Sequence, residues 1–187
     1  MSIILASSSP RRTELLNLIH INHKVIPSTI KETIDYKMSP EDIVQSLADQ
    51  KASDVASKYP NDIIIGADTI VTINNEILGK PKNYEEAFKM LSMLSGNTHK
   101  VITGVCIIVK DKKIKFSCTS DVEFSKMSDE EIKEYINQEN VYDKAGSYAI
   151  QGICAKYIKK IDGDYYNIMG LPLNSLYQTL KENKIIK

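Results

Sequence analysis

The sequence has no excess of charge and no long apolar run. It carries 24 basic and 24 acidic side chains, so its formal net charge is zero. This balance argues against general nucleic-acid or membrane-surface binding as the main task, and any basic site must be local. No apolar run approaches the roughly 20 residues that a membrane-spanning helix needs. Residues 1–6 are not a basic segment followed by a long apolar one, which predicts that there is no signal peptide.

Cysteine is scarce and scattered. Cys106, Cys118 and Cys154 form no CxxC pair, which argues against a zinc site. An odd number of distant cysteines does not form a disulfide framework, so a reducing compartment fits best and we expect a cytoplasmic protein. The three histidines show no metal-ligand spacing, and we expect structural or surface roles for them.

The common nucleotide and hydrolase motifs are missing. There is no GxxxxGK[ST] P-loop and no GxGxxG fingerprint, which excludes a standard P-loop NTPase and a Rossmann dehydrogenase. GxSxG is also missing, and no serine sits in a recognisable triad context, so an α/β-hydrolase is excluded as well.

What the chain does have is an alternation of helical and strand patterns. Its 187 residues, 42% of them hydrophobic, can bury a substantial core. The sequence Ser39-Pro40-Glu41-Asp42 is a strong helix start. The pattern predicts an α/β protein in one domain, with a mixed sheet flanked by helices and a hairpin that could form a second lobe. Strands are expected at 2–6, 23–27, 62–67 with a continuation at 70–73, 101–109, 113–124 and 155–161, and a turn at Asn74-Asn75. Helices are expected at 11–20, 39–58, 84–94, from 128 onward and at 173–180.

Two arginines occupy an unfavourable place. Ser9-Pro10 reads as the cap and first residue of a helix, so Arg11 and Arg12 fall in its first turn, at the positive end of the helix dipole. Together with the hydroxyl and amide groups of the preceding serine loop, they form a ready anion site. The alternative is that both side chains point into solvent, and the local sequence leaves the two open.

Lys51 is a second oddity. At 100° per residue it lies near the middle of the apolar face of the helix at 39–58. A lysine there must extend its ammonium to solvent, pair with an acid or meet a ligand.

Three further stretches place polar groups where ligands can bind. Asp68 and Thr69 follow the buried strand at 63–65, at a position typical of ligand sites in α/β folds, although Asp68 could instead cap a turn. Lys80 lies in a Gly-Lys-Pro turn, which is equally compatible with an ordinary surface lysine. Gln151 ends a loop framed by two glycines and can present both amide atoms to a base edge, or the loop is a bulge before a strand.

These stretches, taken in order, resemble the Maf family of nucleoside-triphosphate pyrophosphatases, also called septum-formation inhibitor proteins. Each match is weak alone, but the ordered set covers nearly the whole chain. The matching residues are 5–12 (LASSSPRR), 66–71 (GADTIV), 78–81 (LGKP), 94–96 (LSG) with His99, 143–146 (DKAG), 150–152 (IQG) and 170–173 (GLPL).

The resemblance implies a fold and a reaction. The implied fold is Maf/ITPase-like, with two lobes around a central cleft, often in a homodimer. The implied reaction is hydrolysis of a nucleoside triphosphate between the α and β phosphorus atoms, with a divalent metal, usually Mg²⁺ or Mn²⁺. The products would be a nucleoside monophosphate and pyrophosphate.

The resemblance also implies residue roles. Asp68 would be the proton acceptor for the attacking water, acting largely with the metal, because a metal lowers the pKa of bound water. Glu32 is the expected second oxygen ligand of a hard cation. The triphosphate would be bound by five residues and the pyrimidine base by two. These are Ser7, Arg11, Arg12, Lys51 and Lys80 for the triphosphate, and Thr69 and Gln151 for the base.

Three positions resemble the dTTP/UTP branch of the family. They are Arg11, Thr69 and Gln151, where the 7-methyl-GTP branch typically has other residues or a different neighbourhood. The resemblance therefore implies a preference for dTTP and UTP, possibly extended to modified pyrimidine nucleotides. Two alternatives are kept: a 7-methyl-GTP-type pyrophosphatase, and a non-catalytic regulator of septum formation that acts by binding a partner.

Overall fold

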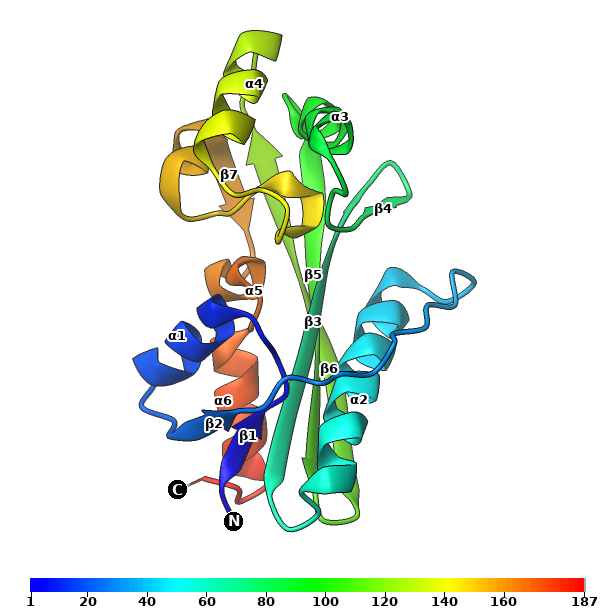
Figure 1. Ribbon diagram of the computed structural model, residues 1–187. Coiled ribbons are helices and arrows are strands. Elements are labelled where there is room, and N and C mark those ends of the chain that lie inside the picture. Colours follow the sequence, from blue (N-terminus) through cyan, green and yellow to red (C-terminus); the bar gives the residue numbers. More distant parts are fainter. Residues whose placement is uncertain (187) are drawn as a thin grey trace. The chain divides into compact units, whose positions relative to one another are not determined.

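The computed structural model describes residues 1–186 of the chain (Figure 1). Helices and strands alternate as the sequence predicts. The strands are β1 (Ile3–Leu5), β2 (His23–Val25), β3 (Ile63–Ile73), β4 (Glu76–Leu78), β5 (Thr98–Val109), β6 (Lys112–Phe124) and β7 (Ile158–Asp162). The helices are α1 (Pro10–Leu18), α2 (Pro40–Lys58), α3 (Tyr84–Leu94), α4 (Asp129–Gln138), α5 (Tyr165–Met169) and α6 (Leu173–Glu182), with 3₁₀ helices η1 (Ala145–Ser147) and η2 (Gly152–Tyr157).

The predicted mixed sheet is confirmed. The sheet has seven strands in the order β2-β1-β3-β5-β6-β7, with β4 paired to β3. The strand β1 pairs in parallel with both β2 and β3, whereas β4 and β7 pair antiparallel with β3 and β6. The predicted turn at Asn74-Asn75 joins β3 to β4, and both residues have positive φ (51° and 63°), as a type I′ hairpin turn requires.

The chain divides into two compact units. Unit 1 consists of residues 1–69, 103–118 and 166–187, and unit 2 consists of residues 70–102 and 119–165. The long strands β3, β5 and β6 contribute residues to both units. The expectations of one domain over residues 1–187 and of a central cleft stay predictions.

The predicted helix starts at Ser39 and Ser128 are confirmed in detail. Ser39 accepts a hydrogen bond from the Asp42 amide at the start of α2. Ser128 forms a capping box with Glu131 at the start of α4. Serine at such positions satisfies amides that the helix itself leaves unpaired, which is why these boundaries can be found from local sequence.

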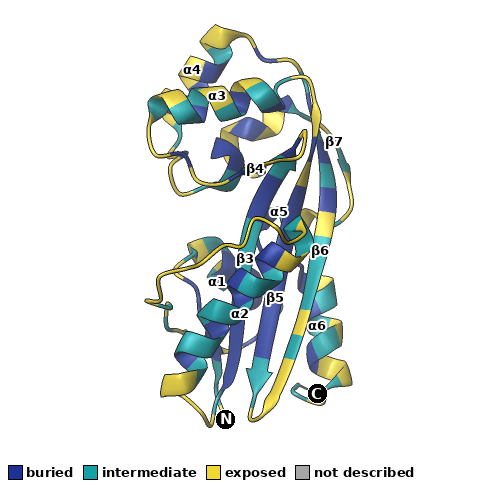
Figure 2. Ribbon diagram, turned by 90° about the vertical axis from the view of Figure 1, so that its right-hand side faces the viewer, coloured by how far each residue is buried: buried dark blue, intermediate teal, exposed yellow. Residues whose placement is uncertain are grey.

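In unit 1, α2 covers one face of the sheet, and α1 and α6 lie on the other (Figures 1 and 2). Two glycines allow α2 to approach the strands closely. A Cβ on Gly66 of β3 would overlap the Ala48 carbonyl oxygen, and one on Gly104 of β5 would overlap the Val44 carbonyl oxygen. A side chain at either position would push the helix away, and with it Lys51.

One predicted strand is wrong at its start. The residues expected to begin a strand at 155 lie in the 3₁₀ helix η2, and β7 begins only at Ile158. Cys154 and Tyr157 are both buried, and their three-residue spacing puts them on one side of a 3₁₀ helix, where residues i and i+3 eclipse.

The core of unit 2 contains a cluster of three rings. His99, Phe124 and Tyr148 meet edge to face, with centroid distances from 4.9 to 5.3 Å. The His99 Nε2 atom lies 2.7 Å from the Tyr148 hydroxyl oxygen. Burial lowers the pKa of His99 to about 4, so this histidine is neutral near pH 7. The structure thus places His99 in a packing role.

Candidate active site

The serine loop between β1 and α1 forms one side of the candidate site. Ser9 occupies the predicted cap position, but within residues 1–186 its side chain makes no hydrogen bond to the helix amides. Its own amide instead donates to the Ser7 hydroxyl, at 3.2 Å. The loop thus fixes the Ser7 oxygen at the entrance of α1, where it meets Arg12.

Arg12 turns away from solvent and is buried, with 8% of its surface exposed. Its Nε donates to the Gly170 carbonyl at 2.7 Å, one terminal nitrogen donates to the Ser7 hydroxyl at 3.0 Å, and the other donates to the Thr69 hydroxyl at 3.0 Å. Gly170 has φ +112°, a backbone conformation that favours glycine. Three neutral acceptors from three parts of the chain therefore hold one guanidinium.

Thr69 belongs to a directed chain of hydrogen bonds. The Thr103 hydroxyl donates to the Asn167 carbonyl at 2.9 Å, and its oxygen lies 2.9 Å from the Thr69 hydroxyl oxygen. Since a hydroxyl has a single proton, Thr69 must donate to Thr103 while it accepts from Arg12. The Thr69 hydroxyl therefore keeps an acceptor lone pair and has no proton left for a ligand.

Ser7 and Arg12, in contrast to Thr69, have hydrogen-bond donors left for a ligand. The Ser7 oxygen accepts two bonds, from Ser9 and Arg12, and within residues 1–186 its hydroxyl proton is donated to no acceptor. Arg12 keeps an N–H on each terminal nitrogen beyond its bonds within residues 1–186. Burial lowers the pKa of Arg12, and the negative charge of Asp68 opposes this effect. A guanidinium stays protonated at neutral pH, so this place offers a positive charge and spare donors.

Lys51 pairs with acids, which decides among the alternatives for it. Its ammonium forms an ion pair with Asp68, at the point where β3 passes α2, and a second with Glu32, at 3.2 Å. The exposed fractions of the side chains are 16% for Lys51, 15% for Asp68 and 41% for Glu32. The two carboxylates converge on one ammonium, and the cluster carries one negative charge in excess.

The donor set of this cluster fits a hard divalent cation in part. Residues 1–186 contain no group of three or more His, Cys, Asp or Glu side chains that could hold a metal. Two carboxylates are nevertheless what Mg²⁺ commonly takes from a protein when a substrate phosphate and water complete its shell. Both carboxylates contact the ammonium of Lys51, so Glu32 and Asp68 are close enough to bind one cation together.

Seven of the nine predicted site residues belong to unit 1. Among them, Ser7, Arg12 and Thr69 form one network, and Glu32, Lys51 and Asp68 form another. The seventh, Arg11, is half-buried in the first turn of α1. The remaining two, Lys80 and Gln151, belong to unit 2 and are exposed. The Gly79 carbonyl accepts the Gly146 amide at 3.0 Å, so the turn of Lys80 lies against the loop that leads to Gln151.

Residues 2–183 match the family described as "Maf-like protein". This chain belongs to the Maf family.

Relatives of this Maf chain are close and nearly of full length. A protein of Bacillus cereus named dTTP/UTP pyrophosphatase is 51% identical over 98% of this chain and 96% of its own. A protein of Bacillus anthracis with the same name is 50% identical over the same shares. The solved structure of a HAM1 protein from Coxiella burnetii has a TM-score of 0.58 and 18% identity, over 97% of this chain and 99% of that one. This likeness supports the predicted Maf/ITPase-like fold.

Sequence reasoning missed three residues of this Maf site. Thr103, Asn167 and Gly170 complete the network around Arg12 and Thr69. Gly170 stands in a stretch that resembles the family, but nothing local indicates its contact with Arg12. Thr103 was missed because it stands in an apolar strand pattern. The one available signal was a polar residue at a position that the pattern predicts to be buried, and the structure shows Thr103 fully buried.

Proposed function

We propose that this chain hydrolyses nucleoside triphosphates, with dTTP and UTP preferred, to nucleoside monophosphate and pyrophosphate. The observation that carries the proposal is that unit 1 contains both a buried guanidinium held by neutral acceptors and a cluster of two carboxylates. The names of the relatives at about 50% identity support the same activity.

The triphosphate is bound by spare donors. Ser7 and Arg12 have a hydroxyl proton and N–H groups to give to anionic oxygens, and guanidinium N–H groups suit phosphate. The amides at the start of α1 add a favourable dipole. Arg11, Lys51 and Lys80 contribute further positive charge in this proposal.

Asp68 takes the proton of the water that is added across the α–β linkage. A carboxylate is a weak base for free water, so the proposal includes a divalent cation, Mg²⁺ or Mn²⁺, held by Asp68 and Glu32. Bound there, the cation would neutralise phosphate charge and lower the pKa of water. With Asp68 and Glu32 holding the cation, the ammonium of Lys51 on α2 would be available to phosphate oxygens.

The base is selected through hydrogen-bond polarity. Thr69 keeps only an acceptor, which suits the N3–H donor of uracil and thymine and not the N3 acceptor of cytosine. Gln151 carries both a donor and an acceptor for the remaining base edge. Two carbonyl oxygens flanking an N–H are common to dTTP, UTP and their 5-substituted derivatives.

The deciding experiment is pyrophosphate release from a panel of canonical, modified and 7-methylated nucleoside triphosphates, with Mg²⁺ or Mn²⁺. Wild type and Asp68→Asn are compared. Turnover of dTTP and UTP that depends on Asp68 supports the proposal, and a preference for 7-methyl-GTP contradicts its substrate assignment. Folded wild-type protein that releases no pyrophosphate from any of them overturns it. The proposed homodimer is tested on the same samples by sedimentation.

Within residues 1–186, no helix is both long and apolar enough to cross a membrane.

A further inference from the structure

The segment 28–34, which carries Glu32, contains neither helix nor strand. It runs along α2 and is tied to that helix by side chains (Figure 1). The first tie is Asp54. One of its carboxylate oxygens accepts hydrogen bonds from the Ser28 hydroxyl, at 2.7 Å, and from the Thr29 amide, at 2.9 Å. The bond from Ser28 is the main reason why the pKa of Asp54 is lowered to about 2.

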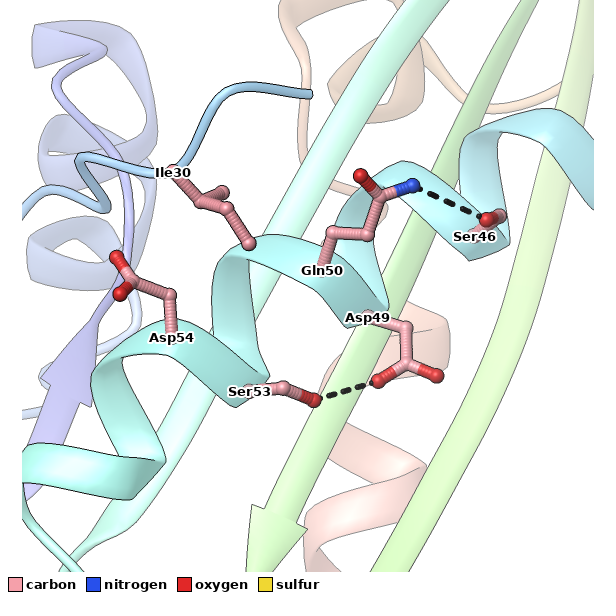
Figure 3. A pocket seen from close by; sticks show the side chains of 6 residues that line it. All are labelled: Ile30, Ser46, Asp49, Gln50, Ser53 and Asp54. Atoms are coloured by element: carbon pink, nitrogen blue, oxygen red, sulfur yellow. Dashed lines mark hydrogen bonds between the residues drawn. The ribbon is translucent and has the colours of Figure 1, made fainter. Parts of the chain in front are cut away.

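The second tie is Gln50, one turn earlier on α2. Its amide oxygen accepts from the Thr33 N–H at 2.9 Å, and its amide nitrogen donates to the Thr33 carbonyl at 2.9 Å. A single side chain thus holds both backbone groups of one residue. Ser46 accepts a further bond from the same nitrogen, at 3.3 Å, which fixes the orientation of the amide (Figure 3).

Apolar packing does little to hold this segment. Ile30 and Ile34 are 44% and 41% exposed. Beneath Ile30, the surface of α2 is hollowed by about 450 Å³, lined otherwise by polar side chains (Figure 3). The ion pair of Glu32 with Lys51 is partly exposed, and such pairs contribute little to order. The hydrogen bonds of Gln50 and Asp54 therefore fix the path of the segment.

We propose that Gln50 and Asp54 are positioning residues that hold Glu32 beside Lys51 and Asp68. Glu32 directly precedes Thr33, the residue held by Gln50, and Lys51 directly follows Gln50. The register set by the Gln50–Thr33 bonds thus aligns Glu32 with Lys51. This inference rests on the proposed function where it concerns the cation that Glu32 would bind.

The same helix supplies matched controls. Gln45 donates to Ser117, and Asp49 accepts from Lys113 and Ser53, so both have polar partners outside the segment. The test compares Gln50→Met and Asp54→Ala with Gln45→Met and Asp49→Ala in the full chain.

The first readout is hydrogen exchange of the amides in residues 28–34, without any ligand. Loss of either side chain removes at least two hydrogen bonds to the segment, so it should speed exchange of these amides by more than the roughly fivefold effect of a single bond, while the controls leave it unchanged. Unchanged exchange in Gln50→Met and Asp54→Ala overturns the inference, whatever the reaction catalysed.

The second readout is Mn²⁺ binding, followed by electron paramagnetic resonance in the presence of a dTTP analogue with a methylene between the α and β phosphorus atoms. Gln50→Met and Asp54→Ala should bind Mn²⁺ about tenfold more weakly, as expected when a partner that orients a ligand is lost. Adding either change to Glu32→Gln should cause no further loss, because the same ligand is affected.

Faster exchange with unchanged Mn²⁺ binding, or an additive loss in the double variants, overturns the positioning role. Pyrophosphate release by wild type separates this failure from failure of the proposed function. If wild type hydrolyses dTTP and the variants bind Mn²⁺ as tightly as wild type, the proposed function is retained and the positioning role is rejected.

Discussion

Unit 1 holds two side-chain cations in opposite ways. Arg12 donates its hydrogen bonds to neutral acceptors, so none of these bonds neutralises its positive charge, and those to Gly170 and Ser7 are buried. Lys51 is held by two carboxylates, so its charge is more than compensated, and its contacts are partly open to solvent. The first arrangement is part of the folded framework and attracts an anion. The second is an exchangeable set of charges that attracts a cation.

The largest effect is expected at Asp68, one of the two carboxylates that hold Lys51. The isosteric change Asp68→Asn removes the proposed proton acceptor and should lower kcat for dTTP by about 1,000-fold, within the range for loss of general-base catalysis. The circular dichroism spectrum and melting temperature should stay close to those of wild type. Near-normal turnover by the folded variant would remove Asp68 from the mechanism.

Arg12 should differ from Lys51 in its effect on stability. Arg12→Met removes three hydrogen bonds and leaves the buried Gly170 carbonyl and the partly buried Thr69 hydroxyl without this donor. The free energy of unfolding should fall by about 3 kcal/mol. Urea denaturation measures this loss. Arg12→Lys should recover little of it, because an ammonium cannot reproduce the three-way fork. A loss below about 0.5 kcal/mol would contradict the framework role.

Lys51→Met should separate activity from stability. The free energy of unfolding should change by less than about 1 kcal/mol, because the ion pairs are partly exposed. Turnover of dTTP should fall about 100-fold through the loss of a fixed positive charge at the triphosphate. Mn²⁺ should bind more tightly to the nucleotide-free variant, since the two carboxylates lose their internal cation. Equal losses of stability in Lys51→Met and Arg12→Met would erase the distinction between the two cations.

A change at Thr69 should have the smallest effect on catalysis, and it tests base selection most directly. Thr69→Val keeps the shape of the side chain but removes the acceptor that the proposal gives to uracil and thymine. The ratio of kcat/KM for dTTP over dCTP should fall by about tenfold. Valine also lacks the hydroxyl that accepts from Arg12. The free energy of unfolding of the same variant is therefore measured, to separate loss of this bond from loss of base selection. An unchanged ratio would exclude Thr69 from reading the base.

Local features were the ones that sequence could predict. The serine caps of α2 and α4, the turn at Asn74 and the unusual place of Lys51 follow from rules that act over a few residues. The identity of the partners did not follow. Lys51 meets Asp68 because Gly66 lets α2 lie directly on β3, a contact that depends on the strand order and not on neighbouring residues.

The network of Arg12 shows the same limit more clearly. A helix dipole argument correctly marks the arginine as out of place, but its acceptors other than Ser7 come from β3 and from the stretch before α6. Thr103 and Asn167 join it through buried hydrogen bonds that leave no periodic signature. Pairing across long stretches of chain is decided by the fold as a whole, so only a resemblance to a family could anticipate it.

The bond between Arg12 and Gly170 also has a consequence for biosynthesis. The two residues are 158 positions apart, which corresponds to roughly 10–30 s of translation at the usual rates. Unit 1 takes its last segment from residues 166–187, so the guanidinium has no carbonyl to meet until that segment has left the ribosome. A nascent chain thus carries all of its candidate catalytic side chains before it can assemble them, and truncated products are expected to be inactive and prone to degradation.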